Sequence, residues 1–195
     1  MKILITGASR GIGLYLLKKF KNEGYTVFGT FFCTQPEADL AKYFTKVDVG
    51  NTEEVQLWVE KNVIEDDEIV LVNCAGINYN SIARRADVEE WMNVINVNLL
   101  GTFRAIRSVL PFMYKKGFGR IINFSSIVAQ RGVIGTSAYA ASKSALWGMA
   151  KAIAAENAQK GITINNINLG YMNAGMTLNE VPENLREEII QQNPS

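Results

Sequence analysis

Short apolar runs alternate along this chain with segments of helical length, and this alternation is the feature that most restricts its fold. Six runs have the composition of strands that are buried on both faces: Lys2–Thr6, Thr26–Phe31, Tyr43–Val47, Ile69–Asn73, Arg120–Phe124 and Thr163–Asn168. Helices are predicted over Gly11–Asn22, Thr52–Val63, Asp87–Tyr114, Tyr139–Gln159 and Glu183–Gln192. With right-handed crossovers, the pattern predicts a doubly wound α/β fold, a three-layer sandwich around a parallel sheet.

Length and charge bound the classes of function. With 195 residues, of which 48% are hydrophobic, the chain can bury one sizeable core, so we expect a single domain over residues 1–195. A formal net charge of +1 gives no overall field that would hold a nucleic acid or an anionic membrane. No apolar run approaches the roughly 20 residues of a membrane helix, and we expect a soluble, cytoplasmic protein.

The cysteines and the absence of histidine narrow the chemistry. Cys33 and Cys74 each lie in an apolar stretch, so buried free thiols are expected rather than a disulfide. Without histidine the chain has no histidine-based triad and no usual zinc site, and we expect no metal. Proton transfer would come from tyrosine, lysine or a carboxylate.

A glycine-rich segment joins the first predicted strand to the first predicted helix, and it reads Thr6-Gly7-Ala8-Ser9-Arg10-Gly11-Ile12-Gly13. The N–H groups and the dipole at the start of a helix attract an anion, and glycines allow the backbone to approach phosphates closely. A glycine cluster could also be an ordinary turn. At this position in the chain it predicts a site for the pyrophosphate of a dinucleotide.

Tyr139 and Lys143 lie four residues apart in a predicted helix, so their side chains share one face. A neighbouring ammonium lowers the pKa of a tyrosine from about 10, so the tyrosine can donate or accept a proton near neutral pH. Ser126 ends a predicted strand thirteen positions before Tyr139. Taken separately, these residues could serve packing, solvation or a strand end. Together with the glycine segment they predict hydride transfer to or from a carbonyl or alcohol.

The chain resembles the short-chain dehydrogenase/reductase family in its single-domain branch, and within it the 3-oxoacyl-carrier-protein reductases. The resemblance rests on T-G-x-x-x-G-x-G over residues 6–13 and on S-x12-Y-x3-K over residues 126–143, and it extends from Met1 to about Met176. It implies a Rossmann fold and a nicotinamide cofactor. The extended branch, with T-G-x-x-G-x-x-G, does not fit.

The resemblance implies a role for each site residue. Tyr139 would exchange the proton, Ser126 would donate a hydrogen bond to the carbonyl oxygen, Lys143 would bind the nicotinamide ribose, and Asn98 would help hold a water that links the lysine to solvent. The implied cofactor contacts are Gly7, Ser9, Arg10, Gly11, Ile12, Gly13, Asp48, Val49, Asn73, Ala75, Gly76, Tyr139, Lys143, Gly170 and Met172.

Several of these residues have structural alternatives. Asp48 could cap the helix that begins near Thr52, and Gly76 could only supply a turn. Asn96 and Asn98 interrupt a long apolar helix, and Asn96 could bend that helix while Asn98 serves the relay.

The residues after the second predicted strand bear on the nucleotide. Enzymes that prefer NAD commonly place an acidic residue there, whereas this chain reads Thr30-Phe31-Phe32-Cys33-Thr34. Arg10 could pair with a 2′-phosphate, as the equivalent arginine does in NADP-dependent relatives, so NADP is the expected cofactor. Arg10 could also be a solvated turn residue, because the second basic residue of some relatives is missing.

Two departures from the family lie near the end of the chain. Leu169 and Ala174 stand where the family has a proline and a threonine that contacts the nicotinamide, so anchoring would use backbone near Met172 or the Asn173 amide. Relatives also continue for about 50 residues, through a last helix and a seventh strand. We therefore expect a truncated chain that lacks them.

The expected substrate is a small carbonyl or alcohol, free or linked to an acidic carrier protein. The basic loop Lys115–Arg120 could meet such a carrier or could be a solvated turn. A homodimer or homotetramer is expected, and small residues could pack there or against the chain's own sheet: Ala138, Ala141, Ala145 and Gly148. The alternative function is a non-catalytic nucleotide sensor or scaffold of the same fold.

Overall fold

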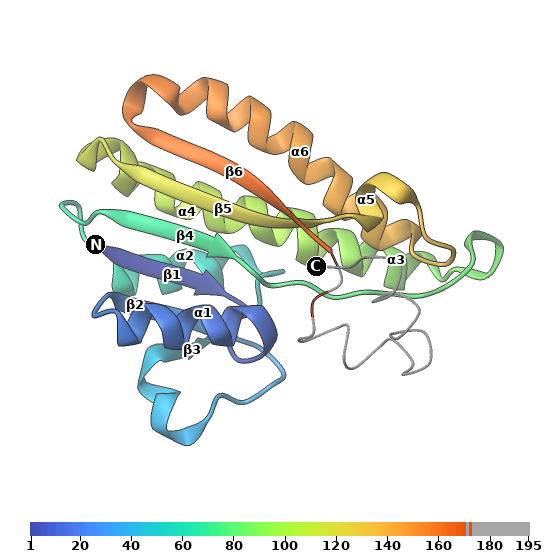
Figure 1. The fold of residues 1–195 in the computed structure, drawn as a ribbon, viewed down its shortest axis with the longest axis horizontal. Helices are drawn as coiled ribbons and strands as arrows, with labels where there is room; N and C mark the ends of the chain where they lie inside the picture. Colours follow the sequence, from blue (N-terminus) through green and yellow to red (C-terminus); the bar gives the residue numbers. More distant parts are fainter. Residues whose placement is uncertain (171, 173–195) are drawn as a thin grey trace.

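The computed structural model describes residues 1–170 and residue 172, and within them one parallel sheet has the strand order β3-β2-β1-β4-β5-β6 (Figure 1). The strands are β1 (Lys2–Thr6), β2 (Thr26–Phe31), β3 (Phe44–Lys46), β4 (Ile69–Asn73), β5 (Gly119–Ser126) and β6 (Ile162–Leu169). The order reverses direction between β1 and β4, where such sheets open a ligand crevice at the carboxyl ends of the strands. The predicted doubly wound α/β fold is confirmed.

Helices cover the two faces of the sheet and complete the three layers (Figure 1). They are α1 (Gly11–Asn22), α2 (Thr52–Asn62), α3 (Val88–Ile95), α4 (Gly101–Lys116), α5 (Val128–Arg131) and α6 (Ser137–Asn157). Short turns of other helix types are η1 (Ala38–Tyr43), η2 (Ala83–Arg85), η3 (Asn96–Leu100) and η4 (Ala158–Lys160). Within the described residues, no helix is long and apolar enough to cross a membrane.

Alternate residues of the central strands feed two separate cores. In β1, Ile3 and Ile5 pack with Leu17 of α1, whereas Leu4 belongs to the larger core on the α2, α4 and α6 side, with Trp58. All of these side chains are at most 2% exposed. Complete burial of one such aliphatic side chain stabilises the fold by roughly 1.5–3 kcal/mol, which explains why apolar residues continue through the whole strand.

The prediction of a single long α-helix over Asp87–Tyr114 is wrong for residues 96–100. Asp87 caps α3, but the helix then widens into the π-helical turn η3 before α4 begins. In η3 the N–H of Gly101 donates to the carbonyl of Asn96, five residues earlier, and the Thr102 hydroxyl donates to the carbonyl of Asn98 at 2.8 Å. Such π-helical turns often mark functional sites, because they shift the side chains of one turn.

Other predicted boundaries of helices and strands differ from the structure by only a few residues. β5 and β6 are longer than predicted, β3 is shorter, and α6 begins at Ser137 rather than Tyr139. Both cysteines are free, but Cys33 is exposed and Cys74 only partly buried, so the prediction of two buried thiols is wrong for Cys33. The helix predicted over Glu183–Gln192 lies outside the described residues.

The start of β6 depends on Gly161, whose φ of 70° lies in the left-handed region. Its carbonyl accepts from the Arg120 guanidinium at 2.8 Å, and a Cβ added to it would collide with the Gly117 carbonyl oxygen. Gly161→Ala should therefore lower the unfolding free energy in urea by about 2–4 kcal/mol, from left-handed strain plus the collision.

The control is Gly24→Ala, where φ is also positive at 86° but nothing lies within 4 Å of the added Cβ. Its cost should be about 1 kcal/mol, from strain alone. Equal losses in the two variants would contradict the role of the Gly117 contact.

Candidate active site

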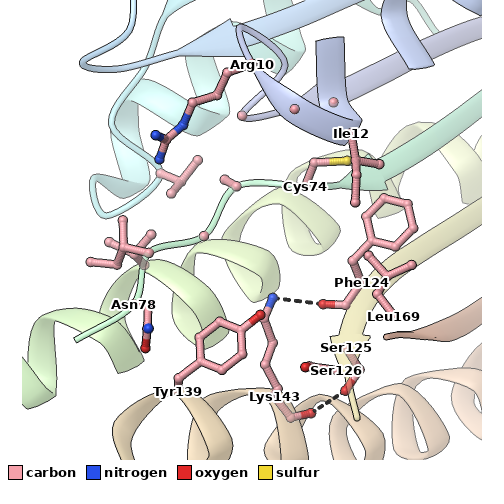
Figure 2. A pocket seen from close by; sticks show the side chains of 18 of the residues that line it. Arg10, Ile12, Cys74, Asn78, Phe124, Ser125, Ser126, Tyr139, Lys143 and Leu169 are labelled. Atoms are coloured by element: carbon pink, nitrogen blue, oxygen red, sulfur yellow. Dashed lines mark hydrogen bonds between the residues drawn. The ribbon is translucent and has the colours of Figure 1, made fainter. Parts of the chain in front are cut away.

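A cavity of about 780 Å³ opens at the carboxyl ends of the strands (Figure 2). Arg10 lies toward one end of it, and Tyr139 and Lys143 project into it from α6 at the other (Figure 2). Nearly all of the predicted cofactor contacts line it: Gly7, Ser9, Arg10, Gly11, Ile12, Gly13, Asp48, Val49, Ala75, Gly76, Tyr139, Lys143, Gly170 and Met172. The predicted residues that do not line it are Asn73 and Asn98. Its size suits a dinucleotide with a small substrate.

The glycine segment forms a close backbone turn before α1. Gly7 has a φ of 62°, and a Cβ added there would lie 2.6 Å from the Ala75 Cα. A Cβ on Gly13 would lie 2.6 Å from the carbonyl oxygen of Gly7. The N–H of Gly7 donates to the Thr30 hydroxyl at 3.0 Å, which fixes the turn on β2. Side chains at Gly7 and Gly13 would disturb this turn, and such a glycine turn at the start of a helix can bind a pyrophosphate.

Ser126, Tyr139 and Lys143 come from two elements and line the same cavity. The Lys143 ammonium lies 5.6 Å from the centroid of the Tyr139 ring and donates to the Phe124 carbonyl at 2.8 Å. The Ser126 hydroxyl accepts the N–H of Val128 at 3.2 Å. With that lone pair engaged, the hydroxyl hydrogen is directed elsewhere and can be donated to a ligand.

Burial changes the titration of two groups at this end of the cavity. Loss of solvent lowers the pKa of Lys143 from 10.5 to about 8, with the neighbouring Cys74 opposing the shift. Burial raises the pKa of the Cys74 thiol to about 12, although Lys143 opposes that change. Cys74 therefore remains a neutral thiol near pH 7, which makes it a poor nucleophile.

Two residues that the sequence did not reveal connect β5 to α6. The Ser125 hydroxyl donates to the backbone carbonyl of Lys143 at 3.0 Å, and it accepts from the Trp147 indole at 2.9 Å. Both hydrogen bonds therefore join β5 directly to α6. A second serine beside Ser126 was the only sequence signal.

Asn98 lies in the π-helical turn and is fully buried. Its side chain accepts from the N–H of Ile77 at 2.8 Å and donates to the Ile77 carbonyl at 2.9 Å and the Ser142 hydroxyl at 3.1 Å. A Cβ added to Gly76 would lie 3.3 Å from Asn98 Oδ1 and 3.7 Å from Lys143 Nζ. Gly76 does not have a left-handed φ, so it serves close approach rather than a turn.

Arg104 connects the segment around Val49 to the π-helical turn, and no sequence pattern indicated this role. Its guanidinium donates to the carbonyls of Val49 and Asn96, both at 3.3 Å, and to Asn96 Oδ1 at 2.9 Å. Its Nε donates to the Thr52 hydroxyl at 3.1 Å. Asn96 therefore binds within this network, while Asn98 faces the catalytic side.

Asp48 does not cap α2, so that alternative is wrong. The cap is Asn51, whose side chain accepts from the N–H groups of Glu53 and Glu54 at 2.9 and 3.2 Å. Asp48 Oδ1 instead accepts from the N–H of Gly50 at 2.7 Å, and Asp48 lines the cavity. Its position beside the cavity is compatible with a nucleotide contact.

Asn73 lies inside the sheet and belongs to a row of asparagines across three strands. It donates to Asn123 at 2.8 Å, Asn123 donates to Asn166 at 3.0 Å, and Asn166 donates to the Leu146 carbonyl at 3.0 Å. The three residues pair in register on β4, β5 and β6. This arrangement gives Asn73 a structural function at the cavity's edge.

Two further sets of predicted residues lie away from this site. The basic loop Lys115–Arg120 is at the amino end of β5, opposite Ser126; Lys115 pairs with Glu65 there. Asn173 and Ala174 lie outside the described residues. Among the residues that the structure does describe, no group of acidic, cysteine or histidine side chains could hold a metal ion.

The lowered pKa of Lys143 predicts a specific dependence of stability on pH. Between about pH 8 and 10.5 the unfolded chain binds more protons at this lysine than the folded chain, so wild-type stability should rise with pH relative to Lys143→Met. The slope should approach roughly 1 kcal/mol per pH unit. Urea unfolding of both variants across this range measures it.

Lys151→Met is the control, because Lys151 is exposed on the same helix. Its stability difference from the wild type should not change with pH in this range. A pH-independent difference for Lys143→Met would show that the lysine is not desolvated.

Comparison with known proteins agrees with this geometry. The sequence model of the family described as short chain dehydrogenase matches residues 1–185. The chain is 33% identical to an acetoacetyl-CoA reductase of Allochromatium vinosum over 96% of this chain and 80% of the relative. It is 33% identical to the 3-oxoacyl-[acyl-carrier-protein] reductase FabG of Staphylococcus epidermidis, over 98% and 82%, and 35% identical to that of Vibrio harveyi, over 89% and 74%.

A solved structure described as a short chain dehydrogenase/reductase family protein has the same fold. The TM-score is 0.86 at 28% identity, and the alignment covers 94% of this chain and 79% of the other. These similarities do not favour the alternative of a non-catalytic sensor or scaffold.

Proposed function

We propose that this chain, which belongs to the short-chain dehydrogenase/reductase family of nicotinamide-dependent oxidoreductases, reduces the 3-oxo group of an acyl thioester with NADPH. The observation that carries the proposal is the position of Ser126, Tyr139 and Lys143 in one cavity with the glycine turn. The names of the relatives support the thioester. A simple ketone or secondary alcohol would use the same groups.

The proposed mechanism assigns one task to each side chain. The substrate carbonyl oxygen lies between the hydroxyls of Ser126 and Tyr139, and both donate hydrogen bonds to it. Tyr139 transfers its proton to that oxygen as the carbonyl carbon is reduced. The Lys143 ammonium, 5.6 Å from the ring centroid, stabilises the phenolate left behind by Coulomb attraction. A bound nicotinamide supplies the hydride for this step.

Lys143 would also bind the cofactor. One of its three N–H donors is used by the Phe124 carbonyl, and the others can reach ribose hydroxyls. Asn98 would hold the water that returns protons to Lys143, in the space that Gly76 leaves open between them. Asp48 and Val49 would contact the adenine, and the backbone near Gly170 and Met172 would contact the nicotinamide.

The partners belong to the proposal as well. A carrier protein that presents the thioester would meet the rim of the cavity on this chain, because Lys115–Arg120 lies at the other end of β5. A homodimer or homotetramer is supported by exposed Leu100 of η3 and Phe103 of α4 and by exposed Ala145 and Gly148 on α6. Residues 1–195 would form one nucleotide-binding and catalytic domain.

Tyr139→Phe tests the proposed mechanism directly. With acetoacetyl-CoA and NADPH as substrates, kcat should fall by about 10³-fold, because the proton donor is removed. The Kd for NADPH, measured by fluorescence titration, should stay within about twofold, since one hydroxyl contributes little to dinucleotide binding. Tyr114→Phe, on the exposed part of α4, should match the wild type in both measurements. Wild-type turnover by Tyr139→Phe would refute the assignment.

Arg10→Gln tests the preference for NADPH. A charge-assisted bond to the 2′-phosphate predicts that the Kd for NADPH rises by about 10- to 100-fold, while the Kd for NADH changes by less than about twofold. Arg107→Gln, a change at an exposed arginine of α4, should alter neither constant. Equal effects of Arg10→Gln on both nucleotides would exclude the phosphate contact.

A further inference from the structure

The loop between α5 and α6 presents an isoleucine to solvent on a fixed turn. The Thr136 N–H donates to the Val133 carbonyl at 3.1 Å, and the Thr136 hydroxyl donates to the same carbonyl at 2.8 Å. Gly135 has a φ of 82°, as the third residue of a type II turn requires. The Gly135 carbonyl accepts from the N–H of Ser81 at 2.9 Å, which ties the turn to the facing loop. The turn that carries Ile134 is therefore hydrogen-bonded within itself and to the loop that contains Ser81.

Ile134 is 92% exposed, the largest exposed fraction of any large hydrophobic residue that the structure describes. It lines the cavity that contains Tyr139, and so do Val133, at 41% exposed, and Met172, at 44%. A single exposed aliphatic side chain needs no explanation, but three that line one cavity give it exposed apolar surface. If an apolar part of a ligand covered these side chains, both the ligand surface and the protein surface would be removed from water, which favours binding.

Among the described residues that line the cavity near Tyr139, Lys143 is the only one with a formal charge. The charged residues among the described lining are Arg10, Asp48 and Lys143, and the first two belong to the glycine turn and the β3 end. The other polar side chains near this end are neutral hydroxyls and amides, among them Ser126, Thr136 and Asn78. This lining suits a neutral polar group joined to an alkyl chain, and apart from Lys143 its described residues offer no cation to pair with a carboxylate or phosphate on a small substrate.

We propose that Ile134 and Val133 form the apolar wall that receives the alkyl end of a 3-oxoacyl substrate, so that the enzyme prefers chains longer than acetoacetyl. The inference rests on the proposed function. The type II turn holds Ile134 in place, so an alkyl chain that extends from the carbonyl past Tyr139 meets a preformed surface. Each methylene that packs on this surface contributes to transition-state binding, and an acyl chain that ends before the surface gains nothing from it.

The experiment compares kcat/KM for acetoacetyl-CoA, 3-oxohexanoyl-CoA and 3-oxooctanoyl-CoA with the nucleotide at saturation. In the wild type, kcat/KM should rise on the order of tenfold for the first two added methylenes, about fourfold for each. In Ile134→Ser this increase should fall to less than about threefold, while the value for acetoacetyl-CoA changes by less than about twofold. Ile64→Ser is the control, since Ile64 is 64% exposed but does not line the cavity.

The outcomes separate the inference from the proposed function. If the wild type reduces none of the three thioesters, the proposed function fails. If it reduces all three equally well, or if Ile134→Ser lowers all three values by the same factor, only the inference is overturned. The chain-length profile of the wild type is informative even without a folded variant, and urea unfolding of Ile134→Ser checks that the variant is folded.

Discussion

A lysine ammonium that is withdrawn from water is costly unless protein acceptors replace the solvent, and the catalytic site of this chain is arranged around such a group. Lys143 donates through Nζ to the carbonyl of Phe124, and its own carbonyl accepts from the Ser125 hydroxyl. These two bonds run in opposite directions between β5 and α6. They hold the strand that ends in Ser126 against the helix that carries Tyr139, so the convergence of these two hydroxyls on one cavity follows from the burial of the lysine.

The features that could be predicted from the sequence are those that depend on local pattern. The middle of a parallel strand between two layers of helices is apolar at successive positions, and Ile3, Leu4 and Ile5 show this directly because neighbours enter different cores. The glycine turn is equally readable, because its glycines stand between the first strand and the first helix. The order of strands and helices and the position of the nucleotide cavity therefore follow from residues that are close together in the chain.

The features that could not be predicted depend on partners distant in the sequence. Arg104 binds the carbonyl of Asn96 in the π-helical turn and also the carbonyl of Val49, which lies 55 positions earlier in the chain. The sequence around Asn96 and Asn98 does not indicate which backbone carbonyls the Arg104 guanidinium binds. Exposure is similarly a tertiary property: an apolar neighbourhood in sequence did not bury Cys33, because the chain leaves the sheet after β2.

The two ends of the cavity are held in place by different kinds of contact. The nucleotide end is backbone in close contact, at Gly7 and Gly13, so a change of side chain there disturbs the fold of the turn itself. The end near Tyr139 includes Val133 and Ile134 on a short loop, whose turn is held by bonds of Val133, Gly135 and Thr136 and not by the Ile134 side chain. Tyr139 is positioned by α6 and not by that loop, so under the proposed function a change in the loop would alter which substrate fits without moving the proton donor. The same division explains how one reaction can be retained while its substrates diverge.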